Sequence, residues 1–342
     1  AEPAWDGSVE IIALSADSHE GLRAQLAAWR DAAGKPDFDR PQRAWMACES
    51  RRDFCREDGH RLVIVAEHGD DLPDLLKKID ERQAASADGW ALPNAWYANQ
   101  PPEGKLAFLF PGQGSQYVGM ARRLACAFPE INEALAAADE STGDSKQRIS
   151  DSIYPVPVFD PTERASHEER LRRTDLAQPA LGAIEWGLAK VLGRFCIHPD
   201  AVCGHSYGEL VALAVAGVMD HKTLRQLTML RGRLMAGDGS DRGAMLAVKA
   251  PLAEIDRMLA ETGIDVVLAN RNAPDQGVLS GAIREIELAA EACTARGFVS
   301  RRLQVSGAFH SPLLADAAEP LAQAIGDAEL ARATVPAIAN ST

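Results

Sequence analysis

A serine between two glycines is the strongest chemical signal in the sequence. Gly204, Ser206 and Gly208 lie in "CGHSYGEL", directly after an apolar strand-like run and before a helical pattern. A tight turn between a strand and a helix projects the serine hydroxyl out of the sheet, and only glycine tolerates the crowding on either side. The first amides of the helix favour negative charge there. The motif predicts Ser206 as a nucleophile; the structural alternative is a plain glycine turn.

A serine nucleophile needs a general base, and the sequence offers eight histidines. His205 adjoins Ser206 in the turn, so we expect its side chain to point elsewhere and pack. His310 lies in "SGAFHSPLL", where a strand end meets a helix start. Such junctions are where α/β folds place working residues. We therefore predict His310 as the base, with a hydrogen-bonded core histidine as the alternative.

One arginine is predicted on the apolar face of a helix. In "HKTLRQLTMLRGRLM" the spacing places Arg231 on one stripe with Leu224, Leu227 and Leu234. A buried guanidinium is costly unless a carboxylate pairs with it. The partner is either a structural Asp or Glu or a carboxylate on the substrate, held by the fork of the guanidinium. Spacing alone does not decide between them.

A glycine-rich loop, "LFPGQGSQYVGM" at 109–120, follows a second apolar run, "KLAFLF". A phosphate cradle is the first interpretation to test. The spacing of Gly112, Gly114 and Gly119 fits neither GxGxxG nor a Walker loop with its lysine, so the sequence argues against a nucleotide site. The glycines are better explained as a turn that brings the loop close to another part of the chain.

The elements that would position these residues follow an α/β order. "KLAFLF" and "DAVCGH" are short apolar runs followed by glycine turns and helical patterns, which predicts parallel strands. Residues 8–100 read as a small α/β unit ending in a linker at 91–105. The segment 143–170 is expected to be irregular with one short helix. After Ser311 and Pro312 the pattern predicts a helix with Ser311 as its cap.

Residues 243–306 show a separate pattern of strand and helix. The order is strand, helix, two strands around a turn, helix and strand, which is the ferredoxin-like arrangement. We therefore expect an α/β fold with a ferredoxin-like subdomain inserted in a larger α/β-hydrolase-like core. The expected divisions are 1–104 for a first small α/β domain, 105–235 with 306–342 for the large subdomain, and 236–305 for the insert.

Composition limits the class of protein and its partners. With 342 residues the chain is expected to hold two or more cores. Its formal charge of −13 argues against nucleic acid or an anionic membrane as partner, because phosphate binding needs clustered Lys and Arg. The longest apolar run is too short to span a bilayer, and no signal peptide is recognisable. The six cysteines form no CxxC pair, which predicts buried thiols, no metal site and a cytoplasmic location.

Six motifs in a fixed order resemble those of malonyl-CoA:acyl carrier protein transacylases, including the acyltransferase domains of polyketide and fatty acid synthases. The resemblance covers residues 105–342, and residues 1–104 look like the linker that joins a ketosynthase to such a domain. The chain is then expected to be part of a larger multidomain synthase. The motifs are "FPGQGSQ" (110–116), "QPAL" (178–181), "GHSYGEL" (204–210), "RGRLM" (231–235), "NAPDQGVLSG" (272–281) and "AFHSPLL" (308–314).

The resemblance implies a ping-pong reaction in polyketide biosynthesis with no bound cofactor. Malonyl-CoA would acylate Ser206, with His310 as base and Arg231 holding the free carboxylate of malonate. A phosphopantetheine thiol on an acyl carrier protein would then attack the ester. The same resemblance implies that the amides of Gln113 and Tyr207 form the oxyanion hole.

Further positions follow the family pattern less closely. Gln178 matches a polar residue near the family's pocket and could equally stabilise the fold. Phe309 favours malonyl over methylmalonyl, because a large ring leaves little room for an α-methyl group; Gly307 replaces a residue that is often histidine. Tyr207 stands where malonyl-specific domains commonly have an aliphatic residue, and its bulk is expected to narrow the pocket. A GHSYGE elbow is similar to iterative synthases of the enediyne or polyunsaturated fatty acid type.

Two expectations concern the base and the competing functions. No convincing acid lies between Ser206 and His310, so we predict a dyad, and the resemblance implies that the group orienting His310 lies beyond residue 342. A serine esterase or thioesterase would share the elbow and the histidine but would not need Arg231. A non-catalytic docking module of a synthase would need none of the three.

Overall fold

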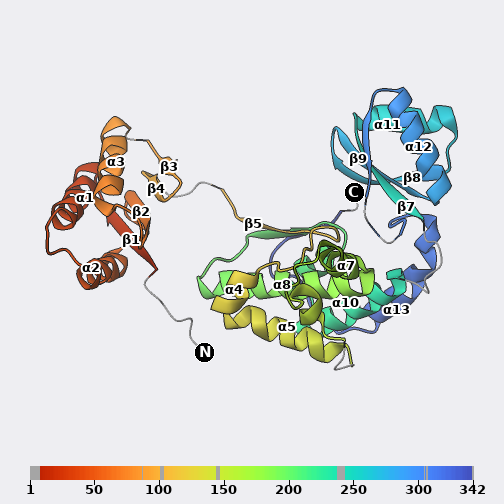
Figure 1. Cartoon of the computed structure of the whole chain (residues 1–342), viewed down its shortest axis with the longest axis horizontal. Coiled ribbons are helices and arrows are strands. Elements are labelled where there is room, and N and C mark those ends of the chain that lie inside the picture. The colour runs from red at the N-terminus through yellow and green to blue at the C-terminus, as the bar shows by residue number, and fades with distance from the viewer. Residues whose placement is uncertain are drawn as a thin grey trace. The chain divides into compact units, whose positions relative to one another are not determined.

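The computed structural model describes residues 8–86, 88–100, 104–143, 147–236, 243–303, 305 and 307–340. The chain separates into two compact units, one ending at Gly104 and the other beginning at Lys105. Figure 1 shows helices and strands in both units, and the mixed α/β fold class is confirmed.

The first unit is an antiparallel sheet with helices. The sheet order is β1-β2-β4-β3, and every pairing is antiparallel. Ser18 caps α1 as its sequence position indicates, accepting a hydrogen bond from the Gly21 amide at 3.1 Å. Its elements are β1 (Val9–Ala16), α1 (His19–Ala33), α2 (Arg40–Asp53), β2 (His60–Glu67), α3 (Leu72–Ala85), β3 (Trp90–Leu92) and β4 (Ala95–Ala98).

The predicted linker at 91–105 is wrong over its first half. Residues 90–98 form the β3–β4 hairpin, with the turn at Pro93 and Asn94. Strand β4 pairs with β2, and the side chains of Trp90 and Tyr97 are buried in the core of this unit. Proline and asparagine here mark a tight turn within a sheet, and the alternating aromatic side chains supply the buried face.

The large subdomain of the second unit has a parallel sheet in the order β11-β6-β5. The predicted parallel pairing of the two apolar runs is confirmed by the register of Phe110 with Gly204. Its strands are β5 (Ala107–Phe110), β6 (Ala201–Gly204) and β11 (Ala337–Ile338), and its helices are α4 (Arg122–Ala127), α5 (Pro129–Ser141), α6 (Ile149–Ile153), α7 (Pro161–Arg172), α8 (Thr174–Arg194), α9 (Gly208–Val215), α10 (His221–Ala236), the 3₁₀ helix η1 (Pro312–Ala317) and α13 (Ala318–Gly326).

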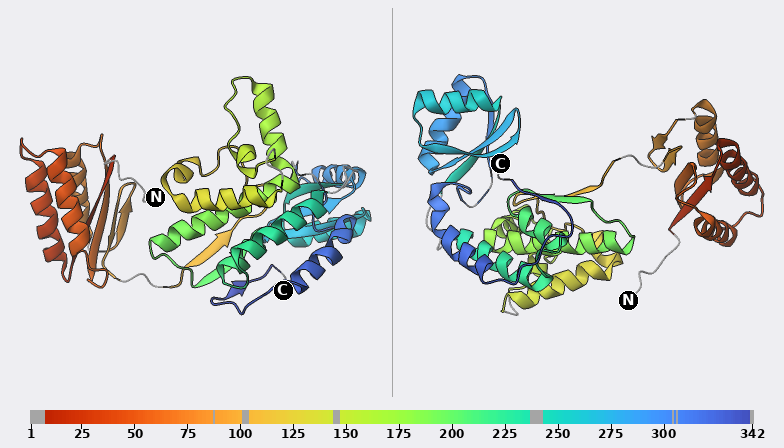
Figure 2. Two further views of the ribbon diagram at one scale, coloured as in Figure 1. Left: turned by 90° about the horizontal axis from the view of Figure 1, so that it is seen from below. Right: turned by 180° about the vertical axis from the view of Figure 1, so that it is seen from behind.

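Two segments of the large subdomain differ from the prediction. One contains more helix than expected, and the other begins as a 3₁₀ helix. The segment 143–170 contains both α6 and α7, and Asp160 caps α7 by accepting from the amides of Thr162 and Glu163. Figure 2 shows the yellow-green α7 standing away from its neighbours. The helix predicted after Ser311 begins as η1, and the Ser311 hydroxyl donates back to the Ala308 carbonyl instead of capping it.

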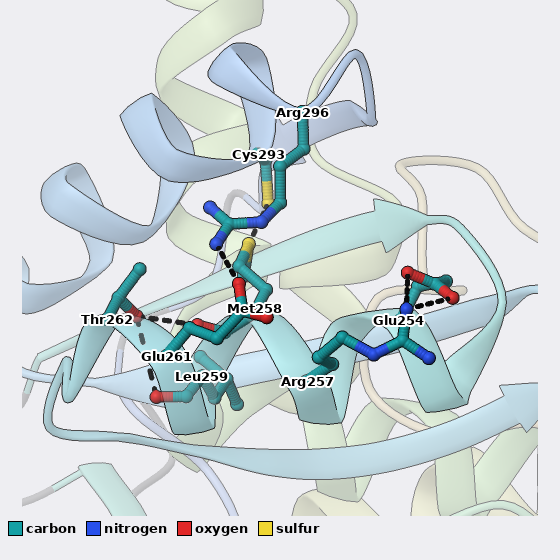
Figure 3. Close-up of polar contacts among 8 residues, drawn as sticks. All are labelled: Glu254, Arg257, Met258, Leu259, Glu261, Thr262, Cys293 and Arg296. Carbon is teal, nitrogen blue, oxygen red and sulfur yellow. Dashed lines mark hydrogen bonds and ion pairs between the residues drawn. The ribbon is translucent and has the colours of Figure 1, made fainter.

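The small subdomain is ferredoxin-like, as predicted. Its antiparallel sheet has the order β10-β7-β9-β8, with α11 and α12 packed against it (Figure 1). Arg296, which follows α12, donates to Glu261 of α11 at 2.7 Å. The thiol of Cys293 in α12 donates to the Met258 sulfur of α11, and Figure 3 shows both contacts. The elements are β7 (Ala244–Lys249), α11 (Leu252–Thr262), β8 (Val266–Ala273), β9 (Gln276–Gly281), α12 (Ile283–Ala295) and β10 (Val299–Arg302).

The prediction that the cysteines are buried is wrong for most of them. All six are free thiols, and only Cys293 is buried. Cys48, Cys55, Cys126 and Cys196 are exposed. Cysteine type alone does not fix burial, because the neighbouring elements decide which face is covered. Among the described residues, no helix combines the length and the apolar character that crossing a membrane requires.

Candidate active site

Ser206 occupies a sharp turn between β6 and α9. Its φ of 51° lies in the left-handed region, where a residue with a side chain is strained. A Cβ on Gly204 would lie 2.1 Å from the Gly208 carbonyl carbon, and one on Gly208 would lie 2.2 Å from the Phe110 oxygen. Both distances are far below van der Waals contact, so the flanking glycines are required by space. The local geometry is that of a nucleophile elbow.

The elbow serine lies against His310. The Ser206 Oγ and His310 Nε2 atoms are 2.7 Å apart, although the residues are separated by 104 positions. His310 sits in the turn before η1, also with a left-handed φ of 59°. No partner of the His310 Nδ1 atom lies within the described ranges of the chain. The pair can transfer a proton from the serine hydroxyl to the imidazole.

The surroundings keep the His310 imidazole neutral. Desolvation by the surrounding protein is the main cause that lowers the pKa of His310 below its usual value of 6.5, and the positive charge of Arg231 lowers it further. A neutral imidazole at pH 7 can accept the serine proton, which suits it for the role of base.

This direction predicts the pH dependence of acylation. Acylation needs neutral His310, so kcat/KM should rise with pH through a single pKa below 6.5 and stay level up to neutral pH. The profile of serine acylation between about pH 5 and pH 8 measures this. A limb centred above pH 6.5 would contradict the assignment of His310 as a desolvated base.

Arg231 extends from α10 toward the nucleophile. Its Nη2 atom is 3.5 Å from the Ser206 Oγ. The helix buries Leu224 and Leu227 of the predicted stripe, whereas Leu234 is only partly buried. In the part of the chain that the structure describes, Arg231 forms no salt bridge with an Asp or Glu. Desolvation lowers the pKa of Arg231. A guanidinium is nevertheless so strongly basic that it remains charged at neutral pH.

The expectation that Tyr207 narrows the pocket is wrong. The side chain is fully buried in the core of the large subdomain, and its hydroxyl lies 3.0 Å from the Thr228 hydroxyl. A Cβ on Gly182 would lie 2.1 Å from that hydroxyl, so the glycine in α8 makes the space for the ring. Arg231 lies over the ring, 5.9 Å from its centre. The Tyr207 ring therefore packs against the Arg231 guanidinium and makes a cation–π contact with it.

A cavity of about 530 Å³ opens in front of the serine. The large subdomain contributes Gln113, Gln178 and Phe309 to its wall, and the small subdomain contributes Met245 and Val278. Charged and polar side chains that also line it are Glu168, Arg172, Asn270, Asn272, Arg301 and Arg302. The volume suits a small acyl group with part of a longer carrier.

Gln178 holds the glycine-rich loop. It is fully buried, and its Nε2 donates to Gln113 Oε1 at 3.3 Å and contacts the Met235 sulfur at 3.6 Å. The Gln113 side chain in turn donates to Thr174 Oγ1 at 3.1 Å. From the sequence, Gln178 either lines the pocket or stabilises the fold. In the structure it does both, because it lines the cavity and also bonds to Gln113 of the glycine-rich loop.

The loop passes directly behind the elbow. A Cβ on Gly112 would lie 2.5 Å from the His205 carbonyl oxygen, and the His205 amide donates to the Phe110 carbonyl at 2.9 Å. Across the described residues, neither the Gln113 nor the Tyr207 backbone amide has a hydrogen-bond partner. Both therefore remain available to an oxyanion, as the family resemblance implies.

The prediction that the His205 side chain packs away from the site is also wrong. The residue is exposed, lines the cavity, and its Nε2 lies 3.0 Å from Asn272 Oδ1 of the small subdomain. The left-handed φ of Ser206 reverses the chain and turns the preceding side chain toward the cavity mouth. The hydrogen bond joins the elbow to strand β8 of the insert.

Sequence reasoning missed Asn340, which follows β11. Its side chain bonds to the backbone on both sides of His205, at Gly204 and Ser206. No local motif marks this residue, because the contact depends on the parallel pairing of β11 with β6.

Comparison with known families agrees with this geometry. Residues 107–342 match the model described as acyl transferase domain. The chain belongs to the acyl transferase domain family. The elbow serine, His310 and Arg231 all lie within the matched residues.

Related proteins include large synthases and a stand-alone enzyme. This acyl transferase domain is 34% identical over 345 residues to "Mycoketide-CoA synthase" of Mycobacterium tuberculosis, a match that covers 100% of the chain and 8% of that protein. It is 35% identical over 245 residues to "Malonyl CoA-acyl carrier protein transacylase" of Bacillus subtilis, covering 69% of the chain and 72% of that protein. The chain thus spans less than a tenth of the synthase.

A solved structure is similar to most of this chain. It is the acyltransferase domain of an iterative polyketide synthase in enediyne biosynthesis, with a TM-score of 0.69 and 26% identity over 97% of this chain and 74% of that one. The similarity noted from the GHSYGE elbow is therefore matched by a structural neighbour of the same type.

Proposed function

We propose that this acyl transferase domain loads a malonyl group from malonyl-CoA onto the phosphopantetheine thiol of an acyl carrier protein, in polyketide biosynthesis. The proposal rests on the charged Arg231 guanidinium, which has no carboxylate partner among the described residues and lies 3.5 Å from the hydroxyl of a serine that contacts a histidine. A free carboxylate on the acyl group would supply the missing partner.

The first half-reaction forms an ester on Ser206. The Oγ atom attacks the thioester carbonyl of malonyl-CoA while His310 Nε2 takes the hydroxyl proton. The amides of Gln113 and Tyr207 stabilise the negative oxygen of the tetrahedral intermediate. The carbon–sulfur bond then breaks, and the proton on His310 passes to the CoA sulfur, which leaves as the thiol.

The second half-reaction reverses these roles for a different thiol. The phosphopantetheine sulfur gives its proton to His310 and attacks the Ser206 ester. The carbon–oxygen bond breaks, and the proton returns to the Ser206 oxygen. No redox step and no cofactor is needed, so the balance closes with malonyl-CoA and the carrier thiol alone.

The cavity wall supports the choice of a malonyl group. Phe309 is buried at the wall, packed with Met235, Met245 and Val278. A rigid ring in this position leaves little space for an α-methyl group, which favours malonyl over methylmalonyl. The basic side chains at the cavity, Arg172, Arg301 and Arg302, suit the phosphates of CoA and of phosphopantetheine in a chain that is acidic overall.

We further infer that the unit ending at Gly104 connects a ketosynthase to this domain in a larger cytoplasmic synthase. The match to the mycobacterial synthase covers the whole chain, including this unit, which supports the inference. The partners are then the neighbouring ketosynthase and a carrier domain.

Mass spectrometry of the full chain incubated with malonyl-CoA tests the proposal. We expect a malonyl adduct on the peptide containing Ser206, which moves to a phosphopantetheinylated carrier protein when that is added. Release of free malonate without transfer would instead indicate a hydrolase. Absence of any adduct would favour a docking role and overturn the proposal.

A further inference from the structure

The nucleophile elbow is braced from outside by Asn340. The side-chain Nδ2 donates to the Gly204 carbonyl at 2.6 Å, and Oδ1 accepts from the Ser206 amide at 2.9 Å. Only this orientation of the amide satisfies both contacts, because one neighbour is an acceptor and the other a donor. The residue therefore spans the elbow and grips the backbone on either side of His205.

A further hydrogen bond fixes the backbone of Asn340. The Asn340 amide donates to Glu209 Oε1 at 2.8 Å, in the first turn of α9. Asn340 also follows β11, which is in parallel register with β6 through Ala337 and Val202. The position of the amide is thus set by the sheet on one side and by the helix on the other.

The elbow needs such a brace because Ser206 is strained. A left-handed φ of 51° is unfavourable for serine and persists only when surrounding contacts impose it. If the Ser206 amide and the Gly204 carbonyl were free, φ could relax to negative values. The direction of the Cα–Cβ bond would change with it, and the Oγ atom would leave its 2.7 Å contact with His310.

The same contact selects the amides that serve the oxyanion. The Ser206 amide is already occupied by Asn340 and cannot donate to the substrate. The Tyr207 and Gln113 amides, without partners among the described residues, are left for that purpose. Asn340 therefore affects two features of the site: the orientation of the Ser206 side chain, and which backbone amides are available to the oxyanion.

We propose that Asn340 is a positioning residue for acyl transfer, which holds Ser206 in its reactive backbone conformation by bridging Gly204 and Ser206. It touches neither the substrate nor the reacting atoms and acts through the elbow. The proposal rests on the proposed function only in taking Ser206 as the nucleophile.

The test compares Asn340→Ala with Thr334→Ala in the full chain. Thr334 belongs to the same segment, and its hydroxyl donates to the Ala216 carbonyl at the end of α9 at 2.9 Å. Both variants lose a side-chain contact to the backbone around α9, but only one of the contacts is at the elbow. Three quantities are measured: the melting temperature, the rate and KM of malonylation, and the rate of inactivation by a serine-directed fluorophosphonate.

For Asn340→Ala we expect malonylation at saturating malonyl-CoA and fluorophosphonate inactivation to slow together by about 10- to 100-fold, because a misplacement near 1 Å costs about that much. KM for malonyl-CoA should change by less than about threefold, since the cavity wall is intact. Thr334→Ala should lower the melting temperature by a similar amount and leave both rates within about threefold of wild type.

Two results would overturn the proposal. One is an Asn340→Ala protein that reacts with both reagents at nearly the wild-type rate. The other is an equal loss of rate in Thr334→Ala, which would show that residues 334–340 stabilise the fold in general and that Asn340 has no specific role at the elbow. If Asn340→Ala does not fold, Asn340→Asp decides: it keeps an acceptor for the Ser206 amide, loses the donor to Gly204, and must also react slowly.

The fluorophosphonate separates this proposal from the proposed function. It reacts with an activated serine whatever the natural acyl group is. A wild-type chain that is inactivated by the fluorophosphonate but is not acylated by malonyl-CoA would refute the malonyl assignment. The inactivation rates of Asn340→Ala and Thr334→Ala would still test the positioning role of Asn340.

Discussion

Replacing Arg231 with alanine should abolish most malonyl loading and leave acetyl loading intact or faster. The guanidinium lies 3.5 Å from the Ser206 Oγ with no carboxylate partner among the described residues. Truncating one partner of a buried charge pair costs about 2–5 kcal/mol. We therefore expect kcat/KM for malonyl-CoA to fall by about 10²- to 10³-fold, whereas acetyl-CoA has no carboxylate to lose.

The stability of the same variant distinguishes a substrate clamp from a structural residue. Removing a buried charge that has no carboxylate partner among the described residues relieves a desolvation cost, so Arg231→Ala should melt at the wild-type temperature or higher. Arg233→Ala, an exposed arginine on the same helix, is the matched control and should change neither loading rate. Equal loss of malonyl and acetyl loading, together with a lower melting temperature, would refute the clamp.

Removing His310 should slow acylation of Ser206 by about 10²- to 10⁴-fold, the usual contribution of a positioned base. His310→Gly is the better variant, because the residue has a left-handed φ of 59° that glycine adopts without strain and alanine does not. The rates of malonylation and of fluorophosphonate inactivation measure the loss. Both should fall, since each needs the serine proton to be removed.

Chemical rescue separates a missing base from a disturbed fold. The space left by the imidazole of His310 is open to the cavity, so added imidazole should restore part of the acylation rate in His310→Gly. His198→Ala, which changes an exposed histidine that does not line the cavity, should behave as wild type. A His310→Gly protein that acylates Ser206 at the wild-type rate would show that another group is the base.

The sequence was informative where the signal is local. The elbow is a short strand, two glycines and a helix start, so adjacent residues determine its geometry. The ferredoxin-like insert was also predictable, because alternating strand and helix periodicities repeat over 243–306. The β3–β4 hairpin was missed because proline and asparagine mark both linkers and tight turns, and only pairing with β2 separates the two.

The directions of the side chains at the elbow could not be predicted from the neighbouring residues in the sequence. Tyr207 was expected to narrow the pocket, yet its ring lies in the core because Gly182 of α8 leaves room for the hydroxyl and Thr228 of α10 contacts it. His205 was expected to pack, yet the left-handed turn at Ser206 directs it to the cavity. The direction of the Tyr207 ring therefore depends on residues of two other helices, and that of His205 on the left-handed φ of its neighbour, which residue types alone do not specify.

The sequence by itself determined which groups this protein brings to chemistry: a serine elbow, a histidine at a strand–helix junction and an arginine on an apolar helix stripe. Residue types and short spacings encode these features. Only the tertiary structure decided that Arg231 reaches Ser206 without a carboxylate partner in the described residues, and that Asn340 braces the elbow from β11. Those facts depend on helix packing and sheet register, which join residues 25 positions apart in the first case and more than 130 apart in the second, and which leave no periodic pattern in the sequence.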